Sequence, residues 1–219
     1  MSGARPTEQK PAERRLERLP LAELPPLETL TQVERLFLTR TPLADLSPLR
    51  GLHRLRVLGL KLTRVTDLSP LAEMAGLESL ILSFTPVRDV TPLAGLRNLR
   101  SLYLTGCGVS DIAPLATLTM LERLDLGGTD VADLRPLAEL RRLASLQLSS
   151  TRVTDLSPLA GLTGLQVLEA GDTAVDDLSP LAGLPALRRL DVRGTKVTRV
   201  PELPGCEIVS AATFRRRRG

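Results

Sequence analysis

The most regular set of side chains able to do chemistry in this chain is a column of aspartates. A carboxylate recurs every 22 residues, at Asp45, Asp67, Asp89, Asp111, Asp133, Asp155 and Asp177, and Arg199 ends the series. Stacked segments could in principle hold a cation here, but calcium needs about six to eight oxygen ligands and each turn supplies one acid beside Leu and Val. Aspartate is common in turns and at the starts of helical segments. We therefore expect these aspartates to cap turns rather than bind a metal.

Other residue types used in catalysis are few. The chain has one histidine (His53), two cysteines (Cys107 and Cys206), no tryptophan and 2% aromatic residues. No pattern of a nucleophilic site surrounds His53, and a lone buried cysteine usually packs rather than reacts. The two cysteines lie more than four repeat units apart, too far for a disulfide. We expect a non-catalytic chain with no metal and no cofactor.

The formal net charge of +4 comes from the C-terminal end of the chain. Residues 1–29 hold five basic and five acidic residues, Arg215 to Arg218 add four positive charges, and residues 30–214 hold 20 of each sign. A duplex-binding protein carries a basic stripe on a folded face, so a neutral body argues against nucleic acid. No apolar run is long enough to cross a bilayer. The first 15 residues lack the apolar core of a signal peptide, and two distant cysteines give no disulfide framework, so we expect a cytoplasmic protein.

A repeat provides the elements that position these residues. Leucine makes up 48 of the 219 residues, and eight consecutive 22-residue units read LxxLxxLxLxxTxVxDLSPLAG with small variations. The units begin at Leu30, Leu52, Met74, Leu96, Leu118, Leu140, Leu162 and Leu184. Residues 16–29 keep the same register as a partial unit, and a ninth unit begins at Cys206 and breaks off. We expect a disordered segment 1–15, an N-terminal cap 16–29, eight repeats over 30–205, a C-terminal cap 206–214 and a basic tail 215–219.

Each unit is expected to contain one strand and one short helical turn. Leu146 and Leu148 alternate with polar residues, as in a strand with one buried face. Ser69 precedes Pro70, which suits the N-cap and first position of a helical turn, and the segment has room only for a 3-10 turn. Parallel strands lie about 4.8 Å apart, so eight of them would form a sheet roughly 40 Å long. A hydrogen-bonding column follows the strand, where the chain turns inward, at Thr41, Thr63, Thr85, Cys107, Thr129, Thr151, Thr173 and Thr195.

On this repeat and its threonine column, the chain resembles leucine-rich repeat proteins of the 22-residue class seen in internalins and in phosphatase regulators. The resemblance covers about residues 16–210, and threonine where many members carry asparagine resembles bacterial members. It implies an α/β leucine-rich repeat solenoid, with a curved parallel β-sheet on the concave face and short 3-10 turns or loops on the convex face. It also implies recognition of another protein, including regulation of enzymes, without naming a target.

Function is expected at the positions that the repeat does not dictate: the sixth, eighth and tenth of each unit on the concave face, and the eleventh at its rim. The eighth column is mostly apolar in the first four units and mostly acidic in the last four. Exposed aromatics on a rigid surface mark interfaces. We expect an apolar anchor, with the acidic half steering a basic segment of the partner. The predicted partner-binding residues are Phe37, Ile81, Phe84, Tyr103, Arg35, Val57, Lys61, Leu62, Asp125, Glu169 and Asp191.

The predicted function is that of a non-catalytic module that binds another protein through its concave face and is a monomer outside its complex. A small-molecule substrate, a membrane span and nucleic acid are not expected. One alternative is an inhibitor or immunity-type protein that blocks a toxin or enzyme through its acidic half. The other is an adaptor for an anionic surface or nucleic acid that works through Arg215 to Arg218.

Overall fold

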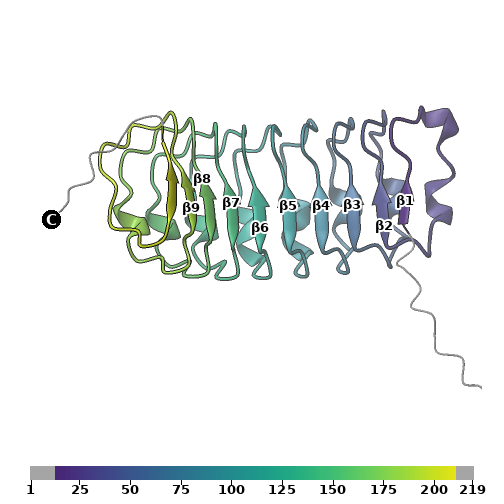
Figure 1. Ribbon diagram of the computed structural model, residues 1–219. Coiled ribbons are helices and arrows are strands. Elements are labelled where there is room, and N and C mark those ends of the chain that lie inside the picture. The colour runs from purple at the N-terminus through teal and green to yellow at the C-terminus, as the bar shows by residue number, and fades with distance from the viewer. Residues whose placement is uncertain (1–12, 211–219) are drawn as a thin grey trace, which may run out of the picture.

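The protein is an open parallel β-sheet whose strands follow one another in sequence order (Figure 1). The structure, a computed structural model, describes residues 13–210. The strands are β1 (Glu13–Arg15), β2 (Arg35–Phe37), β3 (Val57–Gly59), β4 (Ser79–Ile81), β5 (Ser101–Tyr103), β6 (Arg123–Asp125), β7 (Ser145–Gln147), β8 (Val167–Glu169), β9 (Arg189–Asp191) and β10 (Glu207–Val209). The described residues therefore form ten strands where the repeats alone predicted eight, because a strand on either side of the repeats extends the sheet.

The first of these extra strands corrects the predicted disordered segment 1–15. Residues Glu13–Arg15 form β1, which pairs in parallel with β2 so that Arg15 lies beside Phe37. The ladder continues past the strand, where the Leu16 N–H donates to the Phe37 carbonyl at 2.8 Å. At the other end, β10 lies within the predicted C-terminal cap and pairs with β9. Residues 1–12 and 211–219, which include the predicted basic tail 215–219, lie outside the described residues.

The first seven repeats each return to the next strand through a short 3-10 turn, as the sequence predicts, whereas the eighth has no 3-10 turn between β9 and β10. The turns are η1 (Leu21–Glu23), η2 (Leu27–Thr29), η3 (Ser47–Leu49), η4 (Ser69–Leu71), η5 (Thr91–Gly95), η6 (Ala113–Thr117), η7 (Arg135–Leu137), η8 (Ser157–Leu159) and η9 (Ser179–Leu181). The expected N-cap is wrong, since η4 begins at Ser69 itself and the preceding leucine caps it with no side-chain bond. Within residues 13–210, no helix is long and apolar enough to cross a membrane.

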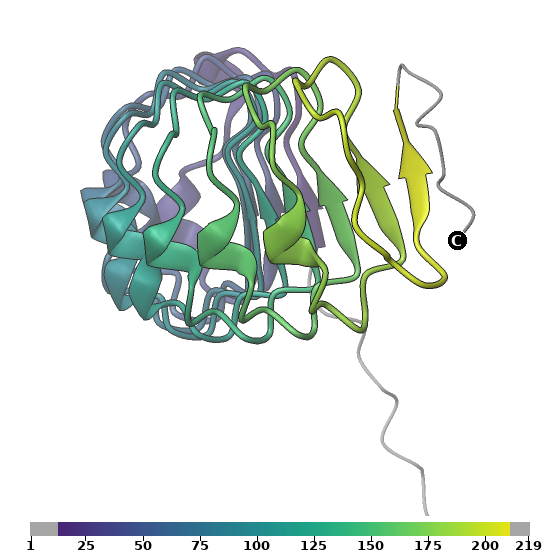
Figure 2. The same cartoon turned by 90° about the vertical axis from the view of Figure 1, so that its left-hand side faces the viewer.

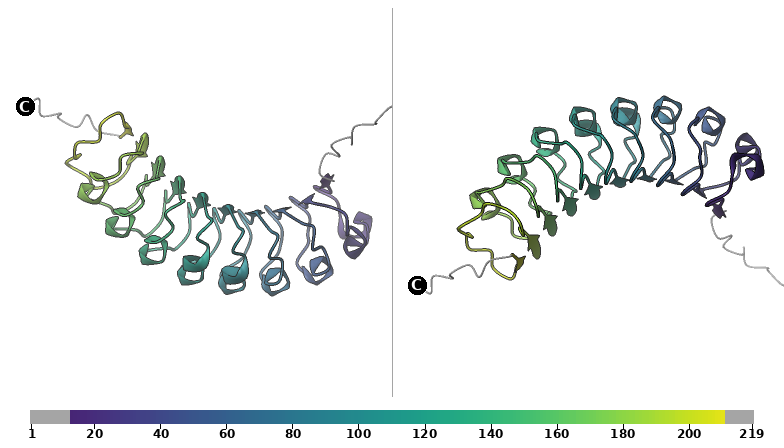
Figure 3. Two further views of the ribbon diagram at one scale, coloured as in Figure 1. Left: turned by 90° about the horizontal axis from the view of Figure 1, so that it is seen from below. Right: turned by 90° about the horizontal axis from the view of Figure 1, so that it is seen from above.

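The strands line the inner side of an arc and the 3-10 turns line its outer side (Figures 2 and 3). Neighbouring strands pair in register, so Leu102 of β5 pairs with Leu80 of β4 and with Leu124 of β6. Every repeat position therefore forms a column along the arc, one strand spacing apart. The inner surface is therefore made of columns of equivalent repeat positions.

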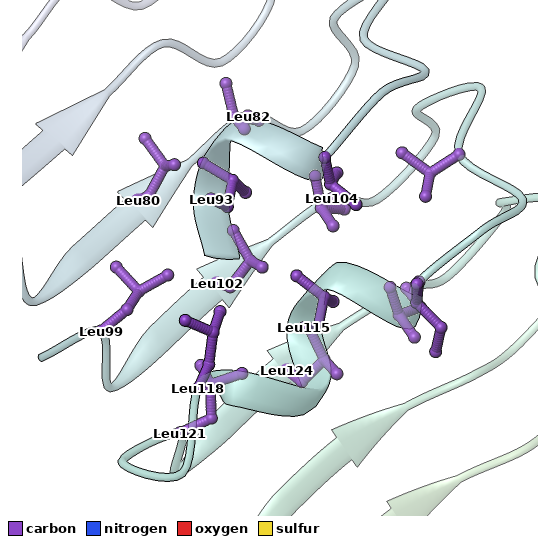
Figure 4. Packing of buried hydrophobic residues seen from close by; sticks show 14 of the residues in the cluster. Leu80, Leu82, Leu93, Leu99, Leu102, Leu104, Leu115, Leu118, Leu121 and Leu124 are labelled. Atoms are coloured by element: carbon purple, nitrogen blue, oxygen red, sulfur yellow. The ribbon is translucent and has the colours of Figure 1, made fainter. Parts of the chain in front are cut away.

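The core lies between the sheet and the turns and consists almost wholly of stacked leucines. Figure 4 shows leucines of β4, β5 and β6 facing those of η5 and η6. Leu80, Leu102 and Leu115 have no exposed surface. The threonine column lies beside this core and is buried except at the half-buried Thr195. Each threonine hydroxyl donates to the carbonyl three residues before it, as from Thr63 to Leu60 at 2.7 Å. This column closes the turn after each strand and has a structural role.

Candidate protein-binding face

Most of the predicted apolar residues of the first four repeats lie close together, among polar side chains, on the inner side of strands β2 to β5. Two hollows on the inner side of the arc share Ile81 and Tyr103 as lining residues. The first hollow is lined by Lys61, Ile81, Ser83, Phe84, Tyr103, Thr105 and Asp125. The second is lined by Arg35, Phe37, Val57, Glu78, Ser79, Ile81, Arg100, Ser101, Tyr103 and Arg123. The structure thus brings together all the predicted apolar residues except Leu62, which lines neither hollow.

Phe37 is held in place by its neighbours on both sides. Its ring covers Gly59 of the next strand so closely that a Cβ atom on that glycine would lie 2.6 Å from the ring. The Arg15 guanidinium lies over the ring at 4.5 Å from its centroid, and that of Arg35 lies at 6.0 Å. Both distances are within the range of a cation–π interaction. Arg35 also approaches the Glu13 carboxylate at 3.3 Å, so β1, which the sequence did not predict, completes this end of the face.

Phe84 and Leu62 project from the rim in a strained backbone conformation. Both occupy the eleventh position of their repeats and have positive φ angles, 59° and 58°, in the left-handed region that suits glycine. They are also exposed, by 49% and 39%. The Phe84 ring lies over Gly106, where an added Cβ would lie 2.7 Å away, and the Lys61 ammonium lies 5.5 Å from the ring centroid. A large apolar side chain therefore stands open to solvent at a costly position.

The acidic half of the face is largely occupied by contacts within the chain. Asp191 is buried, and Arg193 donates to it from its guanidinium and, at 3.0 Å, from its backbone N–H. The Arg193 side chain lowers the pKa of Asp191 below its ordinary value. Glu169 accepts a hydrogen bond from Gln147 and lies 4.0 Å from Arg189. Asp125 accepts bonds from the Thr105 hydroxyl at 2.7 Å and from a backbone N–H.

The aspartate column caps turns, as expected. Each aspartate accepts a hydrogen bond from the backbone N–H two residues further on, over 2.8 or 2.9 Å. In Asp67 and Asp177 the second carboxylate oxygen also accepts a hydrogen bond from the hydroxyl of the serine two residues further on. Among residues 13–210, no three His, Cys, Asp or Glu side chains come together as a metal site would require.

Both cysteines are free thiols. Cys107 replaces a threonine of the buried column, and its thiol donates to the Leu82 carbonyl at 3.2 Å and contacts the Thr85 hydroxyl. Burial raises the pKa of the Cys107 thiol, which favours the unreactive protonated form. His53 is exposed on the loop before β3.

Comparison with solved structures identifies the family. An internalin (inlF) from Listeria monocytogenes is 30% identical with a TM-score of 0.83, over 90% of this chain and 62% of that one. Internalin C2 of the same species is 38% identical with a TM-score of 0.72, over 74% of this chain and 71% of that one. The chain is a leucine-rich repeat protein. It spans less than two thirds of the first of these internalins.

More distant leucine-rich repeat structures share the fold alone. A leucine-rich repeat protein of Leptospira interrogans is 20% identical with a TM-score of 0.81, over 87% of this chain and 50% of that one. A plant peptide hormone receptor, solved in complex with the hormone RGF2, is 17% identical with a TM-score of 0.76, over 90% of this chain and 35% of that one. Comparison with protein-family models finds no match, and comparison with curated proteins finds none either.

Proposed function

We propose that this leucine-rich repeat chain is a non-catalytic module that binds a partner protein on the concave face of its first four repeats. The observation that carries the proposal is that Phe37, Val57, Ile81, Phe84 and Tyr103 line two hollows across β2 to β5 that share Ile81 and Tyr103. Aromatic residues held on a rigid surface provide large contact area at a small entropy cost, which is why they dominate binding energy at protein interfaces.

The solved relatives support this proposal at the level of the fold. The plant receptor shows the same repeat architecture in a complex with a peptide hormone. Because one fold hosts many functions, this likeness alone does not assign a partner, and the proposal depends on the residues of the face.

The inhibitor alternative receives less support from the contacts of the acidic half. A mimic of a basic-site ligand needs carboxylates that are free to pair with the target. Asp191 is instead bound by Arg193, and Glu169 is shared between Gln147 and Arg189. The adaptor alternative depends on Arg215 to Arg218, outside the described residues, so the experiment below tests it directly.

Quantitative affinity capture from the native lysate tests the proposed function. The bait is the wild-type chain, the quadruple variant Phe37→Ala, Ile81→Ala, Phe84→Ala, Tyr103→Ala, or a chain that ends at Phe214. We expect a protein that binds the wild type and the shortened chain equally and is lost with the quadruple variant.

A control variant carries four substitutions on the other half of the same face: Ser145→Ala, Gln147→Ala, Ser149→Ala and Glu169→Ala. It is expected to capture the partner as the wild type does. A partner retained by the quadruple variant but lost with the shortened chain would replace this proposal with a function of the arginine tail.

A further inference from the structure

The loops that follow β2 to β5 have a one-sided charge. Positions ten to fifteen of the first four repeats contain four basic residues and no acidic one. The basic residues are Arg40, Lys61, Arg64 and Arg88, and all four are exposed. In the last four repeats, the same positions contain three basic and three acidic residues. The cationic character therefore belongs to the half of the solenoid that carries the apolar face.

These four cations differ from Arg35, Arg56 and Arg100 of the same half, which have carboxylate partners. Arg123, which also lines a hollow, donates to the Ser101 hydroxyl at 2.9 Å. Arg56 pairs with Glu78 across neighbouring repeats, and Arg100 pairs with Glu122 at 2.7 Å. Within residues 13–210, no carboxylate lies within ion-pair distance of Arg40, Lys61, Arg64 or Arg88. Their charge is therefore available to a ligand.

The same loops contain Leu62 and Phe84 at the eleventh position, where the backbone is left-handed. A non-glycine residue in this conformation costs about 1 to 2 kcal/mol. Gly106, Gly128 and Gly194 occupy the equivalent position of other repeats with φ angles of 65°, 65° and 70°. Glycine is thus compatible with the repeat here, so Leu62 and Phe84 are unfavourable for the fold. Arg40, Ser150 and Asp172 share this conformation in their repeats, so Leu62 and Phe84 are distinguished by carrying a large, exposed apolar side chain at this position.

Backbone hydrogen bonds hold these residues side by side. The Arg40 N–H donates to the Lys61 carbonyl at 2.9 Å, and the Leu62 N–H donates to the Ser83 carbonyl at 3.0 Å. The Phe84 N–H donates to the Thr105 carbonyl at 2.7 Å. The parallel ladder therefore continues beyond the strands and places the segments of Arg40, Lys61, Leu62 and Phe84 in neighbouring turns. Arg64 and Arg88 follow Leu62 and Phe84 in the same loops. We call Arg40, Lys61, Leu62, Arg64, Phe84 and Arg88 the basic rim.

We propose that the basic rim binds an acidic segment of the partner protein that also presents a large apolar side chain. The carboxylates of the segment pair with Lys61 and its neighbours, and the apolar side chain packs on Phe84 and Leu62. The proposal rests on the proposed function, because it names the chemistry of a partner on the same face. It gives the partner segment an acidic character, whereas the acidic half of the sheet predicted a basic one.

The shape of the molecule favours a protein segment over a lipid surface or nucleic acid. Phe84 lines the same hollow as Ile81 and Tyr103. The strands that carry Ile81 and Tyr103 lie on the inner side of the arc (Figure 3). A flat bilayer would reach the rim but not this inner surface. A nucleic acid backbone would pair with the cations but has no group that needs the apolar side chains of Leu62 and Phe84.

Selection of random peptides displayed on phage, with the wild-type chain as bait, tests this chemistry. We expect the selected peptides to be enriched in Asp and Glu together with Leu, Phe or Trp. A synthetic copy of the strongest peptide should bind less tightly as salt concentration rises, because its charges are solvent-exposed. Peptides rich in Lys or Arg, peptides with no acidic bias, or a failure to select any binder would each overturn the proposal.

The affinities of charge variants for that peptide test whether the rim cations bind it. Lys61→Glu should weaken binding by about tenfold or more, because like charges are then brought together. Lys61→Arg, which keeps the charge, should bind within about threefold of the wild type. Equal affinity of the Glu and Arg variants would overturn the role of the rim.

A second pair of variants separates binding from folding. Phe84→Gly should leave the melting temperature unchanged or raise it, and should still weaken peptide binding by about tenfold. Ser150→Gly is the matched control, since Ser150 has the same backbone conformation at the eleventh position of the sixth repeat, in the acidic half, with φ of 59°. It should leave peptide affinity unchanged.

The outcomes also separate this proposal from the proposed function. If the quadruple variant no longer binds the captured protein while Lys61→Glu still binds it, the concave face binds a partner but the basic rim does not contribute to that binding. If the chain binds phosphatidylserine vesicles, and Phe84→Gly leaves that binding intact, the rim is a contact for anionic surfaces and the protein-segment proposal is wrong.

Discussion

Single residues at the eleventh position of each repeat connect the fold to the binding proposal. Here the chain leaves the strand with a positive φ angle in every repeat, whether the residue is Arg40, Leu62, Phe84 or a glycine. Glycine satisfies this geometry without a steric cost, whereas a large side chain opposes it. Repeats with glycine at the eleventh position therefore match the backbone geometry. Repeats that carry a large exposed side chain there do not, so another role is expected for that side chain.

Glycine-to-alanine substitutions at this position test its conformation. Gly128→Ala should lower the free energy of unfolding by about 1 kcal/mol, because alanine resists the left-handed conformation. Gly106→Ala should cost more, because its Cβ would also lie 2.7 Å from the Phe84 ring and displace it. Urea denaturation of both variants measures the difference. An equal cost at the two sites would contradict the packing of Phe84 on Gly106.

The capping aspartates predict how stability depends on pH. Backbone and hydroxyl hydrogen bonds from Ser69 lower the pKa of Asp67 below its ordinary value of 3.8, and bonds from Ser179 do the same for Asp177. A carboxyl whose pKa is lower in the folded state stabilises the fold above the unfolded value, and this contribution is lost as pH falls through the folded pKa. The melting temperature should therefore hold steady from neutral pH downward and fall below about pH 4.

A variant with Asp67→Asn, Asp155→Asn and Asp177→Asn is the control for this pH dependence. It should melt at a lower temperature than the wild type at neutral pH and show a shallower fall in acid. Parallel curves for the two proteins in a calorimetric pH series would show that the carboxylate charge does not stabilise these turns.

For single residues, the sequence predicted which repeat positions align into columns better than it predicted the backbone and side-chain conformations at those positions. The threonine column and its replacement by Cys107 could be inferred, because a small hydrogen-bonding side chain recurs where the backbone turns. The left-handed eleventh position was missed. Its signal was present in Gly106, Gly128 and Gly194, but non-glycine residues at the other five repeats obscured it. The partners of Asp191 and Glu169 depend on side-chain rotamers, which the repeat pattern does not specify.

Among the elements, strand β6 provides the plainest test of the stacked core. Leu124 lies at the centre of β6 and is 2% exposed. Leu124→Ala should lower the free energy of unfolding by about 2 to 5 kcal/mol, since it leaves a cavity between two neighbouring repeats. Leu21→Ala, at a leucine that is 54% exposed, should cost far less. Equal melting temperatures for the two variants would contradict the stacking.

Strand β1 is the element that sequence analysis missed. Glu13, Arg14 and Arg15 contain no apolar residue, so no alternation marked a strand there. Backbone pairing with β2 and the stacking of Arg15 on Phe37 provide its stability. The inner strands and turns were predicted because leucine alternation and the Ser-Pro signal repeat in them, and repetition makes a weak local signal reliable.

Truncation tests what β1 contributes. A chain that begins at Leu16 should be less stable than one that begins at Glu13 by about 1 to 3 kcal/mol, because it loses the ladder bonds and the cation–π contact. The ring of Phe37 should also become more accessible to solvent. Thermal denaturation of the two chains gives the comparison. Identical melting temperatures would mean that β1 does not stabilise β2.

In the whole molecule, the two halves of one continuous sheet have different surfaces. The first four repeats present apolar side chains and a rim of cations that form no ion pair with any residue of 13–210. The last four present polar side chains that largely bond to one another. Register makes this division possible, because each repeat position is a column in which residues can change without disturbing the leucines beneath. We therefore propose that the first half recognises the partner and that the second half has a mainly structural role.

The most direct test of this division is the dissociation constant of the captured partner for three forms of the chain. These are the wild type, the quadruple variant of Phe37, Ile81, Phe84 and Tyr103, and the control variant of Ser145, Gln147, Ser149 and Glu169. The account predicts that the quadruple variant binds at least about 30-fold more weakly, the size expected when interface hot spots are truncated, with the control variant close to the wild type. Unchanged affinity in the quadruple variant, or a larger loss in the control variant, would contradict it.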